Sequence, residues 1–145
     1  MATIQSFENL EVWKKARELS QKIYTVTLIE DFSKDFALRN QINRASGSIM
    51  DNIAEGFERG GRKEFIQFLS YSKGSAGEVK SQLCRAVDRD YISKEDFEKF
   101  EKEILEIGKM IGGLINYLKK TSIEGVKYLK EPVELYQSHH FDLED

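Results

Sequence analysis

The spacing of apolar residues in the last third of the chain limits its fold more than any other feature. Seven of them recur at alternating steps of three and four: Phe97, Phe100, Ile104, Ile107, Ile111, Leu114 and Leu118. Such a stripe stays on one side of an α-helix and is buried against partner helices. We therefore expect a long helix that is stable only when it packs against other helices.

Three earlier segments have the same spacing, which predicts three further helices. Their stripes are Val12, Ala16, Leu19, Ile23 and Val26, then Ile42, Ala45, Ile49, Asn52 and Gly56, then Phe65, Leu69, Ser72, Ala76, Val79, Leu83 and Ala86. The predicted breaks are short: residues 33–35, residues 60–61, and the stretch before Ser93, which forms an acidic capping-box variant with Asp96. Short connections make neighbours antiparallel, so we predict an all-α fold, an up-down-up-down antiparallel four-helix bundle.

The pattern decays after residue 120, which suggests two parts. We expect residues 1–120 to form the bundle and residues 121–145 to form a loosely structured, acidic C-terminal extension. The extension has six carboxylates and two lysines, a net charge of −4, which leaves +1 on the bundle because the whole chain carries −3.

The N-terminal sequence, the longest apolar stretch and the number of cysteines indicate where in the cell the protein is expected. The N-terminus has no basic segment followed by a long apolar run, and the longest apolar stretch, residues 110–118, falls short of the roughly 20 residues that a membrane-spanning helix needs. Cys84 is the only cysteine, so no disulfide can form within the chain. These features predict a soluble cytoplasmic protein without a membrane partner.

Polar residues flank the apolar stripe on the second and third predicted helices. Because both helices rise about 1.5 Å per residue from the turn at residues 60–61, facing residues have numbers that sum to about 121–124. This register sets Gly47 against Gly74, where we expect a close approach, and leaves Asn52 in need of a partner such as Ser72 or a buried water. The polar pairs that it predicts are Gln41 with Gln82, Arg44 with Glu78, Ser48 with Ser75, Asp51 with Tyr71, Glu55 with Gln67, and Arg59 with Glu64.

The same carboxylates raise an enzymatic interpretation, in which Asp51, Glu55 and Glu78 hold a divalent metal. We disfavour it because no second acidic pair at suitable spacing faces them. The only histidines, His139 and His140, lie in the extension. We therefore expect a satisfied polar ladder between helices, with no catalytic residue, metal site or cofactor.

Basic residues gather at the end of the predicted bundle that contains the start of the first helix, the second turn and the end of the last helix. They are Lys14, Lys15, Arg59, Arg62, Lys63, Lys119 and Lys120. Repeated by the symmetry of an oligomer, such a patch can contact phosphates without reading sequence. The alternative is an ordinary solvated surface, because nearby carboxylates dilute the patch: Glu8, Glu11, Glu58 and Glu64.

Three blocks of this sequence resemble the four-helix-bundle family of the 23S rRNA intervening-sequence proteins, which includes the accessory variability proteins of diversity-generating retroelements. The blocks are FENLEVWKKARELSQKIY, QINRASGSIMDNIAEGFERGGRKEFIQFLSYSKGSAGEVKSQL and DYISKEDFEKFEKEILEIGKMIGGLINYL. The family's short elements correspond here to Ser48 and Ile49, to Asn52 through Gly56, and to Gly74, Ser75 and Glu78. With the ladder they give a structural motif of Arg44, Ser48, Asp51, Asn52, Glu55, Gly56, Gly74, Ser75 and Glu78.

The resemblance implies homo-oligomers, commonly five-fold rings, and no catalytic residues. For the retroelement branch it implies binding of nucleic acid and of a reverse transcriptase. We therefore expect a non-enzymatic accessory protein, a pentamer, that contacts an RNA or DNA backbone. The alternative is a scaffold that docks a partner protein, such as a reverse transcriptase, and does not itself bind nucleic acid strongly. Aromatic residues at the edges of the stripes are its candidate contacts: Tyr24, Phe32, Phe36, Phe68 and Tyr117.

Overall fold

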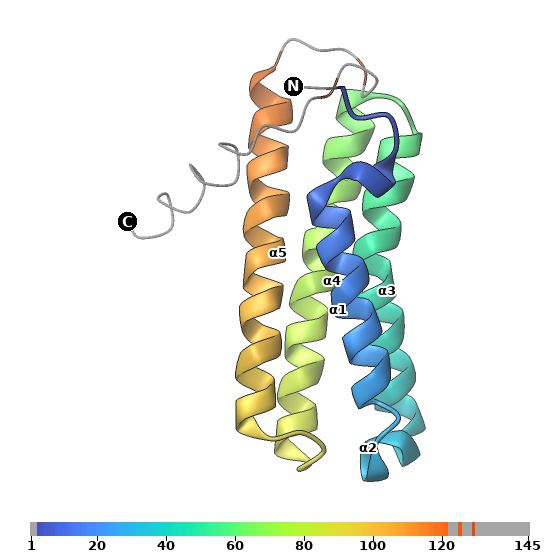
Figure 1. Ribbon diagram of the computed structural model, residues 1–145, viewed down its shortest axis with the longest axis vertical. Helices are drawn as coiled ribbons and strands as arrows, with labels where there is room; N and C mark the ends of the chain where they lie inside the picture. The colour runs from blue at the N-terminus through green and yellow to red at the C-terminus, as the bar shows by residue number, and fades with distance from the viewer. Residues whose placement is uncertain (1–2, 122–124, 126–128, 130–145) are drawn as a thin grey trace, which may run out of the picture.

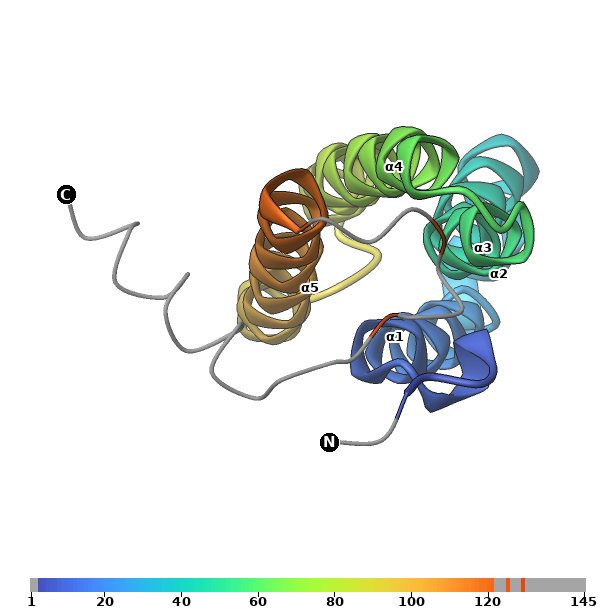
Figure 2. The same ribbon diagram turned by 90° about the horizontal axis from the view of Figure 1, so that it is seen from above.

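Four long helices run alternately up and down in the computed structural model, which describes residues 3–121, 125 and 129 (Figure 1). Viewed along their axes, α1 lies next to α3 and α5, and α4 lies between α3 and α5 (Figure 2). The predicted all-α, up-down-up-down bundle is confirmed. The helices are η1 (Phe7–Asn9), α1 (Glu11–Val26), α2 (Glu30–Lys34), α3 (Phe36–Glu58), α4 (Arg62–Asp88) and α5 (Lys94–Lys120).

Side-chain caps begin η1, α3 and α5, and a glycine follows the end of α3. The Ser93 hydroxyl accepts the N–H of Asp96 at 3.0 Å, which confirms the predicted capping motif at the start of α5. The Asp35 carboxylate accepts the N–H of Leu38 at 3.2 Å at the start of α3. Gly60 ends the α3 side of the second turn with φ = +85°, a left-handed conformation that favours glycine.

The connection between α1 and α3 differs from the prediction. It begins at Thr27 and contains α2, whereas the sequence suggested a break only at residues 33–35. Thr27 is fully buried, its hydroxyl donates to the Tyr24 carbonyl at 2.7 Å, and it accepts the Asn43 amide at 3.0 Å. This bond to α3 stabilises a chain reversal that no glycine or proline marks in the sequence.

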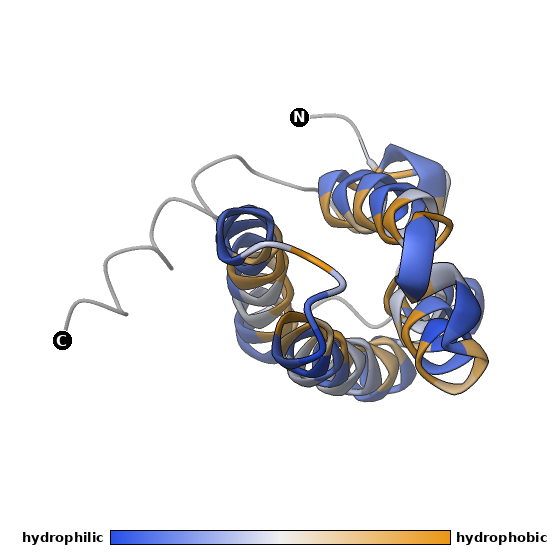
Figure 3. Ribbon diagram, turned by 90° about the horizontal axis from the view of Figure 1, so that it is seen from below, coloured by the Kyte–Doolittle hydropathy of each residue, from blue (hydrophilic) through white to orange (hydrophobic). Residues whose placement is uncertain are grey.

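The predicted stripes meet in a single core. Figure 3 shows the apolar residues turned mainly toward the space that the helices enclose. Side chains with no more than 1% exposure come from all four long helices, and each contributes roughly 1.5–3 kcal/mol when removed from water. They include Leu19, Ile23, Ile42, Ile49, Ile53, Phe65, Leu69, Leu83, Ile107, Ile111 and Leu114. None of the helices in the described part of the chain is both long and apolar enough to cross a membrane.

The chain beyond α5 contributes to the bundle at two described positions. Leu129 is fully buried, and its carbonyl accepts the N–H of Ile4 at 2.8 Å. Gly125 forms an isolated antiparallel bridge with Gly61. The predicted division at residue 120 stays a prediction, and most of the acidic extension lies outside the described residues.

Candidate functional site

Two hydrogen bonds between α3 and α4 agree with the predicted register. The Ser75 hydroxyl donates to the Ser48 hydroxyl at 3.0 Å, which is one of the six predicted pairs. The buried Ser72 hydroxyl donates to the Ile49 carbonyl at 2.6 Å. Both bonds fix how far one helix has slid along the other, so the structural motif has the alignment that the turn at residues 60–61 predicts.

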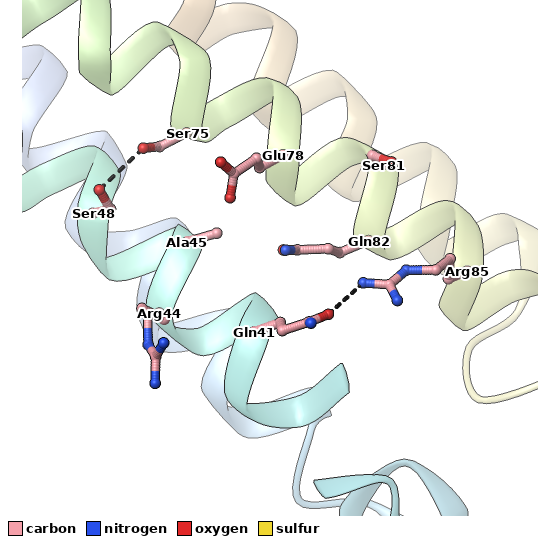
Figure 4. Close-up of a pocket in the computed structure, with 9 residues that line it drawn as sticks. All are labelled: Gln41, Arg44, Ala45, Ser48, Ser75, Glu78, Ser81, Gln82 and Arg85. Atoms are coloured by element: carbon pink, nitrogen blue, oxygen red, sulfur yellow. Dashed lines mark hydrogen bonds between the residues drawn. The ribbon is translucent and has the colours of Figure 1, made fainter. Parts of the chain in front are cut away.

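At the Gln41 end of the predicted polar ladder, the side chains do not pair as predicted. The Arg85 guanidinium donates to the Gln41 side-chain oxygen at 2.6 Å, so Gln41 does not pair with Gln82 as predicted. Arg44 points away from Glu78 (Figure 4), and neither makes an ion pair within the described chain, so this predicted pair is also wrong. Arg44 and Glu78 are both exposed, and an ion pair between solvated side chains contributes little to the free energy of folding.

At the other end, side chains bond along their own helix. Arg59 forms an ion pair with Glu55 at 2.9 Å, not with Glu64. The Gln67 amide donates to the Tyr71 hydroxyl at 2.7 Å, so Gln67 does not pair with Glu55 nor Tyr71 with Asp51. Residues four apart on a helix are close neighbours, and here these contacts replace the predicted ones between helices.

Asn52 finds its partners one turn back in α3. Its side-chain amide donates to the carbonyl and to the hydroxyl of Ser48, each at 2.8 Å. Asn52 is half-buried, and Ser72, its predicted partner, bonds to Ile49 instead. The amide therefore holds the Ser48 hydroxyl in place for Ser75 and does not itself cross to α4.

The close approach of α3 and α4 occurs at Gly56. A Cβ atom added there would lie 2.5 Å from the Phe68 Cβ atom and 3.2 Å from Cδ1 of Phe65. At Gly47 and Gly74 an added Cβ atom would meet nothing within 4 Å, so the close approach predicted there is wrong. An added side chain at Gly47 or Gly74 would therefore meet open space.

The structure separates the seven predicted basic residues by what they contact. Three form ion pairs, Lys14 with Glu11 at 3.2 Å, Lys15 with Glu106 at 3.1 Å and Arg59 with Glu55 at 2.9 Å. Arg62 is half-buried, and its guanidinium donates to the carbonyls of Leu118 at 3.3 Å and Thr121 at 2.7 Å. It closes the C-terminal end of α5, so its role in the fold is structural.

Lys63, Lys119 and Lys120 are exposed and make no ion pair within the described residues. They are joined by Lys73, which the sequence analysis missed. Lys73 and Lys119 line a groove of about 530 Å³ between α4 and α5, together with Ser70, Gly74, Gly112, Ile115 and Asn116. Lys80 forms an ion pair with Glu101 at 3.4 Å, which gives the alignment of α4 with α5. Lys73 lies about two helical turns before Lys80 on α4, so the same alignment of α4 and α5 predicts that Lys73 lies beside α5.

Two lysines of α1 form ion pairs with α5. Lys22 forms an ion pair with Glu103, and Lys15 pairs with Glu106, so two bridges link α1 to α5. The hydrogen bond and the charge of Glu103 raise the pKa of Lys22. These cations are therefore neutralised at the surface between the two helices.

A polar cluster closes the end of the bundle opposite Gly60. The Asp35 carboxylate accepts the Tyr91 hydroxyl at 2.8 Å and the Arg89 guanidinium at 2.9 Å. The Tyr91 hydrogen bond, then the Leu38 N–H, lower the pKa of Asp35, while the same Asp35 bond raises the pKa of Tyr91. Each partner belongs to a helix end or turn, so the cluster ties α3 to the connection between α4 and α5.

Several apolar side chains stay exposed near the connection between α1 and α3. They are Tyr24 at 51% exposure, Leu28 at 50%, Ile29 at 52% and Phe36 at 64%. Phe32, also predicted as a contact residue, is 1% exposed and stacks on Tyr91 with ring centres 5.2 Å apart, so that prediction is wrong. The remaining candidates, Phe68 and Tyr117, are half-buried.

No group of three or more His, Cys, Asp or Glu side chains within residues 3–121, 125 and 129 is arranged to hold a metal ion. Asp51, Glu55 and Glu78 therefore do not form a candidate metal site there. Asp51 and Glu78 have no ionic partner in this part of the chain, and Glu55 is paired with Arg59.

A family model for the 23S rRNA-intervening sequence protein matches residues 8–113. The chain belongs to this family. The match extends from η1 through most of α5, and it confirms the resemblance that the sequence blocks indicated.

A solved structure has the same fold. It is a protein of unknown function from the S23 ribosomal protein family of Bacteroides thetaiotaomicron VPI-5482, with a TM-score of 0.66 and 29% sequence identity. The similarity covers 76% of this chain and 99% of that chain. A search of curated proteins finds no match.

Proposed function

We propose that this intervening-sequence family protein is a non-enzymatic accessory protein that associates with a nucleic-acid backbone. The observation that carries the proposal is a set of four exposed lysines without ionic partners in the described chain, at and near the end where α4 begins and α5 ends: Lys63, Lys73, Lys119 and Lys120. Unpaired ammonium groups can neutralise phosphates and release counterions.

The fold supports this surface in two ways. Arg62 bonds to the last carbonyls of α5, which holds the helix end that carries Lys119 and Lys120 close to the start of α4. Lys73 and Lys119 both border the α4–α5 groove, so an RNA or DNA backbone can lie along it. Phosphate contacts of this kind position a nucleic acid without specifying sequence.

Two double charge reversals on α5 test the proposal, because they change the net charge equally. Fluorescence anisotropy of a labelled oligonucleotide, measured at several salt concentrations, should show salt-dependent binding by the unmodified protein. K119E/K120E should weaken this binding, whereas K94E/K102E should change it little, because Lys94 and Lys102 lie nearer the opposite end of α5. Equal losses from both variants, or no binding even near 50 mM salt, would overturn the proposal.

A second candidate function is a scaffold that docks a partner protein, such as a reverse transcriptase. The exposed apolar residues Tyr24, Leu28, Ile29 and Phe36 support it, because contiguous apolar surface is typical of protein contacts. They are also candidate contacts for a cytoplasmic homo-oligomer, with a pentamer as the best single expectation from the family resemblance. Native mass spectrometry of the purified chain tests this assembly, and a strict monomer at micromolar concentration would contradict it.

A further inference from the structure

A second groove, between α3 and α4, has a lining unlike that of the lysine surface. It has a volume of about 570 Å³ and lies between two of the hydrogen bonds that join the helices, Ser75 to Ser48 and Arg85 to Gln41 (Figure 4). Ser48 and Ser75 close one end, Gln41 and Arg85 close the other, and the small side chain of Ala45 leaves the space between them. The groove is large enough for a small polar group, because ligand pockets begin near 300 Å³.

The two walls of the groove carry side chains of opposite charge that lack partners within the described residues. Arg44 on α3 and Glu78 on α4 both line the groove, and neither has an ionic or hydrogen-bond partner in the described chain. Figure 4 shows the Glu78 carboxylate lying between the helices, while Arg44 is turned outward and is free to swing back. One wall therefore offers N–H donors and the other offers carboxylate acceptors.

Gln82, a third residue that lines the groove, also lacks a hydrogen-bond partner for its side-chain oxygen among the described residues. Its side chain reaches from α4 toward α3 and lies between Ala45 and Gln41 in Figure 4, and it is only 9% exposed. A buried acceptor without a donor destabilises the fold.

We infer that this groove accepts a guanine base from a single-stranded nucleic acid. Guanine is the base that presents two acceptors, N7 and O6, next to two donors, the N1 and N2 hydrogens. A guanidinium such as Arg44 matches the first edge, and a carboxylate such as Glu78 matches the second. The Gln82 amide lies on the α4 wall next to Glu78, where it can bond to the same base. An unstacked base in a single strand can reach such a groove, whereas a paired base in a duplex cannot.

The inference rests on the proposed nucleic-acid association, and it adds base preference to phosphate binding. The test uses uridine oligonucleotides with one central guanosine or one central adenosine, measured by fluorescence anisotropy. We expect the guanosine strand to bind on the order of tenfold more tightly. Replacing guanosine by inosine, which lacks the N2 amine, should remove much of this preference.

The variant Glu78→Gln should abolish the preference for guanosine over inosine. Arg44→Ala should weaken binding of guanosine more than binding of 7-deazaguanosine, which lacks N7 but keeps O6. Glu98→Gln is the matched control, because Glu98 is an exposed carboxylate near the start of α5, outside the groove and away from the lysine surface. Circular dichroism should show the same helix content for all three variants.

The outcomes separate this inference from the proposed function. Salt-dependent binding with equal affinity for guanosine and adenosine strands would overturn the inference about the groove and leave the backbone contact intact. An equal loss of guanosine preference in Glu78→Gln and Glu98→Gln would do the same. If no strand binds, both the inference about the groove and the proposed nucleic-acid association are wrong. Titration with guanosine alone gives a readout that does not depend on the lysines. The side-chain amide signal of Gln82 should then shift in the NMR spectrum, and an unmoved signal would contradict the inference.

Discussion

Replacement of Gly56 by alanine tests the packing of α3 on α4 most sharply. The new Cβ atom would lie 2.5 Å from the Phe68 Cβ atom, which is attached directly to the α4 backbone and cannot rotate away. Overpacking costs about 1–3 kcal/mol, and a contact of 2.5 Å with an atom fixed to the backbone falls in the upper part of that range, about 2–3 kcal/mol. The better helix propensity of alanine offsets about 1 kcal/mol. We expect a net loss of about 1–2 kcal/mol in the free energy of unfolding, and a Tm lower by about 3–8 °C.

Gly47→Ala is the matched control on the same helix. Nothing lies within 4 Å of a Cβ atom at Gly47, so only the propensity gain of about 0.5–1 kcal/mol remains and Tm should rise. Urea unfolding followed by circular dichroism gives both free energies. A Gly56→Ala protein as stable as the unmodified chain, or a destabilised Gly47→Ala protein, would refute the packing described for this hairpin.

Two other substitutions probe the ends of the bundle. Arg62→Met should lower the free energy of unfolding by about 1.5–3 kcal/mol, because it removes charged hydrogen bonds to the end of α5, whereas Lys63→Met should change it by less than about 0.5 kcal/mol. Asp35 has a folded-state pKa below its unfolded value of about 3.9, so its contribution is complete above that pH and is lost as pH falls through the lower folded value. The stability difference between the unmodified chain and Asp35→Asn should therefore shrink in acid, and a difference that grows as pH falls would contradict the Tyr91 bond as its cause.

The apolar stripes predicted the four long helices well, because each helix must bury one face whatever its neighbours are. The turn at Gly60 and the cap at Ser93 were also predictable, since both are local features of backbone and side chain. The connection after α1 was not predictable, because it depends on the bond between Thr27 and Asn43, which are brought together only by the finished fold.

Partner choice at the candidate sites was less predictable than register. Ser48 and Ser75 are short, so their bond follows directly from the alignment of the helices. Arg59 is long and can reach across to α4 or along α3 to Glu55, and such alternatives differ by less than about 1 kcal/mol. For the same reason the sequence located the basic end but could not say which of its cations remain unpaired.

The dependence of nucleic-acid affinity on salt tests the central claim most directly. If the four lysines of the proposed surface, Lys63, Lys73, Lys119 and Lys120, each neutralise one phosphate, the logarithm of the binding constant should fall with the logarithm of salt concentration with a slope of about −3 per subunit. Anisotropy titrations of the unmodified protein measure this slope. A slope near −3 that falls by about half in K119E/K120E agrees with the proposed surface, and a slope near zero in the unmodified protein would contradict it.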